Sequence, residues 1–218
     1  MHVVRGSPEA DQGRVRELNV ARRRLPSVGL VVAIAVGMLV SGSPAVAATT
    51  SSTPQLQAML LTVANLPPGW SQSGSVSPTT SSCYSNPIWK APYQAKARAG
   101  FQMNNSVPQL VELLGSYQNG GAAYRQVVAS LNGCSRFSET VQGQKISGTV
   151  SPMSNKRFGT ASSSYTANLS VGGTSLNQEF VIARKGNTLA AIAVSNYGSL
   201  DSQLLDGFAA TAMRKIPA

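Results

Sequence analysis

The chain has 218 residues, of which 18 are lysine or arginine and 8 are aspartate or glutamate, so its formal net charge is +10 at pH 7. The basic residues are scattered singly or in short groups, whereas nucleic-acid-binding proteins cluster lysine and arginine on one element. The only histidine is His2, so the rest of the chain lacks the usual general base of Ser-His and Cys-His nucleophilic sites.

The first 47 residues have the order of a secretory signal peptide. Three arginines at 22–24 precede an apolar run from Val28 to Val40, and Ala45-Val46-Ala47 supplies a small-x-small cleavage site. The apolar run is shorter than the roughly 18 residues of a membrane-spanning helix, so an uncleaved anchor is the less favoured alternative. The sequence therefore predicts a secreted, extracellular protein with a signal peptide at 1–47, a flexible leader at 48–54 and a single domain at 55–218.

The two cysteines, Cys83 and Cys134, are predicted to form one disulfide, because exported proteins fold in an oxidising compartment. Two cysteines without a histidine cannot supply the four ligands of a zinc site. We therefore predict no metal and no cofactor.

The first half of the domain mixes helical and extended patterns. Residues 55–64 carry apolar side chains at helical spacing, and the prolines at 67–68 stop that helix. Residues 95–103 alternate apolar and polar side chains, which predicts a strand, whereas residues 107–117 fit a helix and a strand equally well. The central helix, at 121–134, has an apolar face formed by Tyr124, Val127, Val128 and Leu131, and Asn132-Gly133 offers a residue that tolerates positive φ at its end.

The second half has a β-like pattern and ends in a helix. Strands are predicted within 137–150, 163–171, 176–183 and 188–194, with tight turns at 172–173 and 185–187. Residues 199–213 are predicted to form an amphipathic helix with Ser199 as its N-cap. The fold predicted from this order is α+β: a single antiparallel β-sheet with two or three helices packed beside it and one disulfide.

Two stretches of the sequence resemble a known family. Leu60-Leu61-Thr62 followed by Asn65-Leu66-Pro67-Pro68-Gly69-Trp70, and the segment 111–117 followed by Ala122-Ala123 and Cys134, are similar to exported actinobacterial sensor domain-containing proteins of the PknH-like extracellular domain family. The resemblance covers roughly 56–213 and favours a strand at 107–117. It implies a cleft between the sheet and the helices, and binding of an unidentified extracellular ligand. Many relatives are kinase ectodomains or lipoproteins, whereas this sequence carries no kinase domain, so direct signalling is not predicted.

These observations predict a secreted, non-catalytic, ligand-binding (sensor-like) domain that acts at the cell envelope. The predicted partner is a small-molecule, lipid or cell-wall ligand, with no nucleic acid, and the protein is predicted to be a monomer. Without residues 1–47 the net charge is +7, which predicts at most peripheral contact with an anionic envelope surface. The alternatives are a secreted hydrolase that uses a carboxylate pair or a Ser-Lys dyad, and a protein-interaction accessory module.

Ligand-binding residues are predicted in two places. Trp89, Tyr84 and Tyr93 lie in a proline-rich segment around Cys83 and can line a cleft as stacking residues. Glu179 and Arg184 form either a buried charge pair in the cleft or a cross-strand pair on the surface. Trp70 is interpreted as a structural residue that fills the edge of the domain. No catalytic residue is predicted.

Overall fold

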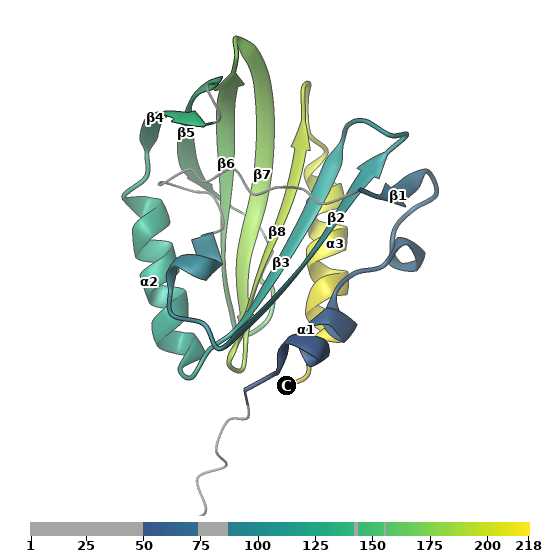
Figure 1. Cartoon of the computed structure of the whole chain (residues 1–218), viewed down its shortest axis with the longest axis vertical. Helices are drawn as coiled ribbons and strands as arrows, with labels where there is room; N and C mark the ends of the chain where they lie inside the picture. The colour runs from purple at the N-terminus through teal and green to yellow at the C-terminus, as the bar shows by residue number, and fades with distance from the viewer. Residues whose placement is uncertain (1–49, 74–86, 142–143, 155) are drawn as a thin grey trace, which may run out of the picture. The chain divides into compact units, whose positions relative to one another are not determined.

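The computed structural model describes residues 50–73, 87–141, 144–154 and 156–218, all within a compact unit formed by residues 46–218. Figure 1 shows this unit as one large sheet with helices packed against it. Among the described residues, no helix is long and apolar enough to cross a membrane.

The sheet has eight antiparallel strands in the order β1-β2-β3-β8-β7-β6-β5-β4. The strands are β1 (Trp70–Gln72), β2 (Ala95–Met103), β3 (Gln109–Ser116), β4 (Arg136–Val141), β5 (Gln144–Met153), β6 (Ala161–Val171), β7 (Thr174–Lys185) and β8 (Thr188–Asn196). A two-residue turn joins β6 to β7, where Gly172 and Gly173 adopt φ values of +57° and +87° that glycine tolerates best. The predicted single antiparallel sheet is confirmed, and so is the strand at 107–117.

Three helices and two short 3-10 turns cover parts of this sheet. They are α1 (Thr53–Met59), α2 (Gly120–Asn132), α3 (Ser202–Lys215), η1 (Val63–Asn65) and η2 (Pro87–Lys90). Alternate residues of each strand point to opposite faces, so Val181 and Ile192 lie in one core while Phe180 and Leu189 lie in the other. The α+β fold with helices beside one sheet is therefore confirmed, with helices on both faces.

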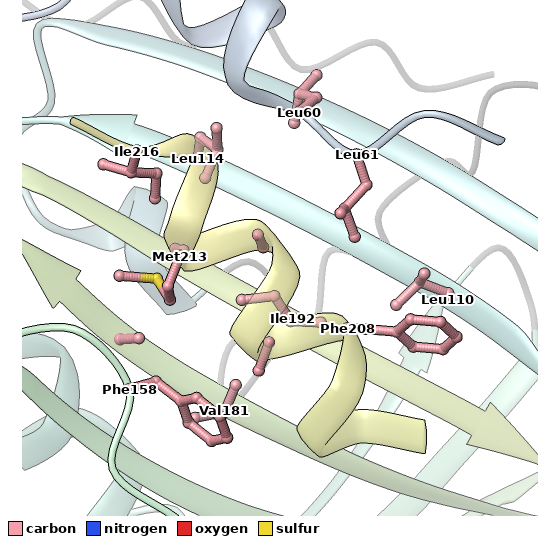
Figure 2. Close-up of a cluster of buried hydrophobic side chains, with 14 of the residues drawn as sticks. Leu60, Leu61, Leu110, Leu114, Phe158, Val181, Ile192, Phe208, Met213 and Ile216 are labelled. Atoms are coloured by element: carbon pink, nitrogen blue, oxygen red, sulfur yellow. The ribbon is translucent and has the colours of Figure 1, made fainter. Parts of the chain in front are cut away.

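The two faces of the sheet are named here by the helices that cover them. On the α3 face, α3 and α1 pack against β2, β3, β8 and β7 (Figure 2). On the α2 face, α2 and η2 bury side chains of β3, β8, β7, β6 and β5. In Figure 1, α3 and α1 lie toward the β1 edge, whereas α2 lies toward the β4 edge. Each face is therefore covered by helices over a different part of its width.

Trp70 closes the α3-face core at the β1 edge. Its side chain is 5% exposed, and its ring packs edge-on against Phe208 of α3, with ring centroids 5.3 Å apart at an angle of 83°. The structural interpretation of Trp70 is confirmed.

The first helix is shorter than predicted. Residues 55–64 were expected to form one helix, but α1 ends at Met59 and the 3-10 turn η1 follows. The reason is a competing partner, because the Leu61 N–H donates to the Glu112 carboxylate of β3, 2.6 Å away, rather than to a helical carbonyl. A tertiary hydrogen bond thus overrides the local helical pattern.

Two other helix ends also differ from the prediction. Asp201, not Ser199, is the N-cap of α3, since its carboxylate accepts from the Gln203 N–H at 2.9 Å. The Ser199 carbonyl is instead held in the preceding turn by the Asn196 side chain. A residue with positive φ was expected at the end of α2, but its C-cap, Gly133, has a φ of −77°.

The predicted disulfide involves one residue outside the described ranges, Cys83. Cys134 is buried in the α2-face core, with 3% of its surface exposed. We expect the intact mass of the protein to be about two daltons below that of its reduced form, because closing one disulfide removes two hydrogens. A mass that does not change on reduction would contradict the pairing.

Candidate functional site

Two of the predicted aromatic residues lie together on the α2 face. The Lys96 ammonium group of β2 lies over the rings of both Trp89 of η2 and Tyr93. Its Nζ atom is 4.9 Å from the centroid of each ring. The Trp89 indole N–H also donates to the Leu114 carbonyl at 3.3 Å. Because the Lys96 ammonium makes a cation–π contact with each ring, a ligand stacked on either ring would have to compete with that contact.

The remaining predicted residues do not join this pair. Tyr84 lies outside the described residues. Glu179 and Arg184 point to opposite faces of β7, because their cross-strand neighbours Val194 and Leu189 belong to the α3-face and α2-face cores respectively. They therefore form no ion pair. Glu179 accepts a hydrogen bond from the Ser202 hydroxyl, and Arg184 donates to the Gly186 carbonyl.

A groove of about 470 Å³ opens between α2 and the neighbouring parts of β5 and β6. Its lining comes from Val128 and Asn132 of α2, from 152–154, Lys156 and Arg157 around the end of β5, and from 162–165 at the start of β6. Sequence reasoning did not identify these residues, since it assigned Val128 and Tyr165 to ordinary apolar faces.

Hydrogen bonds between α2 and β6 fix the walls of this groove. The buried Tyr165 hydroxyl donates to the Asn132 side chain at 3.1 Å, and the hydroxyls of Tyr124 and Ser163 are 2.8 Å apart. Burial raises the pKa of Tyr165 above its usual value, so its hydroxyl keeps its proton. Hydroxyl and amide groups in the walls of the groove are therefore held in place by hydrogen bonds.

The charges on the groove are positive. Arg157 and Lys156 lie at its exposed side, and the lining contains no aspartate or glutamate. The Lys156 ammonium also lies 3.3 Å from the Asp206 carboxylate of α3. This arrangement suits a ligand that carries both hydroxyl groups and a negative charge.

The most perturbed carboxylate, Glu112, is in the α3-face core and away from the groove. It is 0% exposed, and its Oε1 has no hydrogen-bond partner. Burial raises its pKa to about 7, against smaller opposing effects of the Leu61 N–H and the Lys215 ammonium. Lys215 of α3 donates to the Leu60 carbonyl, so the Leu60–Leu61 peptide group is held between a carboxylate and an ammonium.

No metal-binding cluster is found in the described part of the chain. Histidine, cysteine, aspartate and glutamate side chains there form no group of three or more that could hold a metal ion. Lys156, which lines the groove together with several serines, has a side chain that is 77% exposed, whereas a lysine that acts as a base in a Ser-Lys dyad needs a desolvated position.

Comparisons with known proteins identify the fold. No protein-family model matches the sequence, and no curated protein matches it. Among solved structures, the chain is similar to the crystal structure of the extracellular domain of PknH from Mycobacterium tuberculosis, with a TM-score of 0.56 and 12% identity over 77% of this chain and 97% of that chain. The resemblance seen in the sequence is thus confirmed at the level of the fold: the chain shares the fold of the extracellular domain of PknH.

Proposed function

We propose that this protein is an exported, non-catalytic, sensor-like domain that acts at the cell envelope and binds a small ligand in the groove between α2 and β6. The observation that carries the proposal is the composition of the groove. Hydroxyl and amide groups held by hydrogen bonds line it, together with the cationic side chains of Lys156 and Arg157. The fold shared with an extracellular domain supports an envelope location, as does the predicted signal peptide.

The ligand class follows from the groups that line the groove. Side-chain hydroxyls and amides pair with ligand hydroxyls, and an arginine pairs with a carboxylate or phosphate in a bidentate geometry. We infer a small anionic, hydroxyl-bearing molecule, such as a sugar acid or a sugar phosphate of the cell wall. The hydrolase alternative gains no support here, because the groove lining has no carboxylate to act as an acid or base.

A pair of adjacent substitutions on α2 tests the groove. Val128 lines it, whereas Ala129 lies on the exposed side of the same helix. We expect Val128→Trp to fill the groove and abolish binding, and Ala129→Trp to leave binding intact. Native mass spectrometry of each variant, incubated with a small-molecule extract of the host cell envelope, reports bound ligand as a discrete mass adduct.

The outcomes separate clearly. An adduct in the wild type and in Ala129→Trp, but not in Val128→Trp, supports the groove as the binding site. An adduct that persists in Val128→Trp would contradict this site, and the absence of an adduct in every variant would contradict small-ligand binding. Thermal unfolding of both variants checks that the substituted helix still packs.

A further inference from the structure

One part of the α3 face of the sheet is covered by none of the helices that the structure describes. Helix α3 packs against β8 and β7, and the α3-face core includes no residue of β4, β5 or β6. Figure 1 shows α3 toward the other side of the sheet, near β1 to β3. Most side chains of β4 to β6 that point to this face are exposed or half-buried, whereas Ser164, which pairs with Val181, is buried.

These side chains form rows across neighbouring strands. One row is Arg136, Thr149, Asn168 and Asn177, and the next is Ser138, Ser147, Ser170 and Ser175, each running from β4 through β5 and β6 to β7. A third row joins Ser151 and Thr166 to Glu179. We call this set the hydroxyl face. Neighbours within a row are about 4.8 Å apart, and rows are about 7 Å apart.

The hydroxyl face is polar but carries few charges. Its centre contains only serine, threonine and asparagine, and its charged residues lie at the margins. Arg136 marks the β4 margin, with the exposed Lys145 of β5 beyond the serine row. At the opposite margin, Glu179 is engaged by the Ser202 hydroxyl.

The polar groups of this face are available to a partner. Among the residues that the structure describes, the side chains of Ser138, Ser147, Thr149, Ser151, Thr166, Asn168, Ser170 and Ser175 make no hydrogen bond to protein groups. These side chains are short and stand on a rigid sheet, so ordering them against a ligand costs little conformational entropy. The face thus offers a preorganised array of donors and acceptors.

We propose that the hydroxyl face binds an extended acidic polysaccharide. A sugar polymer presents hydroxyl groups at regular intervals, which match an array of serine, threonine and asparagine side chains. Arg136 and Lys145 supply charge complementarity to its carboxylates, in a domain whose predicted mature form carries a net charge of +7. This surface is on a different face of the sheet from the α2 groove, and the inference does not rest on ligand binding there.

The test compares three soluble probes by affinity electrophoresis at physiological salt. Polygalacturonate carries both hydroxyl and carboxylate groups, poly-L-glutamate carries carboxylates without hydroxyls, and dextran carries hydroxyls without charge. We expect polygalacturonate to retard the protein most strongly. Equal retardation by polygalacturonate and poly-L-glutamate would overturn the proposal in favour of plain charge attraction, and no retardation by polygalacturonate would overturn it outright.

Matched variants locate the binding surface. The double variant Ser147→Glu with Ser170→Glu places two negative charges in the serine row, and we expect it to weaken polygalacturonate binding at least about tenfold, because these charges would repel the carboxylates of the polymer. The control, Gln126→Glu with Ser130→Glu, makes the same charge change on exposed positions of α2. An equal loss in both pairs would overturn the assignment to this face.

Two further variants separate this proposal from folding and from the groove. Asn168→Leu removes an exposed donor and acceptor without changing charge, and should weaken binding while thermal unfolding stays close to wild type. Val128→Trp fills the α2 groove and should bind polygalacturonate as the wild type does. Loss of binding in Val128→Trp, with Asn168→Leu unaffected, would place the polysaccharide in the groove instead.

Discussion

Replacing Glu112 with glutamine is expected to stabilise the protein by about 3 kcal/mol at pH 8 and to change its stability little near pH 4. The carboxyl group is 0% exposed, and its pKa is raised from 4.5 to about 7, mainly by burial. In the unfolded chain the same group ionises near its ordinary pKa. The ionised Glu112 carboxylate therefore destabilises the folded state at high pH, and glutamine, which carries no charge, removes this destabilisation.

The sign of the pH dependence follows from which state holds the proton. Between the unfolded pKa of about 4.5 and the folded pKa of about 7, the folded state keeps the proton that the unfolded state has lost. Unfolding then releases a proton, so stability falls as pH rises through this window and levels off above it. Denaturant titrations of wild type and Glu112→Gln from pH 4 to pH 9 measure the difference directly.

Two variants check that the effect belongs to this carboxyl group. Glu179→Gln removes the same charge from a half-buried position and should not reproduce the effect. Lys215→Gln removes the ammonium that lowers the pKa of Glu112, so the loss of stability should extend to higher pH. It should also destabilise the protein at every pH, because Lys215 donates to the Leu60 carbonyl. Parallel pH profiles for wild type and Glu112→Gln would contradict the raised pKa.

Much of the sheet could be predicted from the sequence because its signals are local. The alternation of apolar and polar residues correctly predicted the bounds of β2, Ala95–Met103. The Gly172-Gly173 pair predicted the β6–β7 turn. Residues 107–117 were ambiguous because β3 is buried on both faces and so has no polar side to mark its period.

The helix ends and the candidate sites were harder to predict because they depend on contacts between distant residues. Leu61 leaves the first helix to reach Glu112, which is 51 residues away. The α2 groove exists only once Asn132 and Tyr165 meet, and neither residue carries a motif. Strand parity, in contrast, could have separated Glu179 from Arg184, since residues five apart on one strand point to opposite faces.

The second large effect concerns Trp70, whose replacement by alanine is expected to destabilise the protein by about 3–5 kcal/mol. The side chain is 5% exposed and fills the β1 end of the α3-face core against Phe208. Alanine would remove this ring and leave a cavity between the strand and α3. Equilibrium unfolding in urea, followed by far-UV circular dichroism, measures the change in unfolding free energy.

Trp70 contributes to stability through packing rather than through a hydrogen bond of its indole nitrogen. Trp70 Nε1 is buried and has no hydrogen-bond partner, whereas Trp89 Nε1 donates to the Leu114 carbonyl. Trp70→Phe keeps an aromatic ring against Phe208 and loses no hydrogen bond, so it should cost far less than Trp70→Ala. A Trp70→Phe cost equal to that of alanine would mean that the size of the indole, and not the presence of an aromatic ring, holds β1 to α3. A Trp70→Ala cost below about 1 kcal/mol would show instead that the β1 edge can be lost without loosening the core, since buried large-to-small substitutions normally cost more.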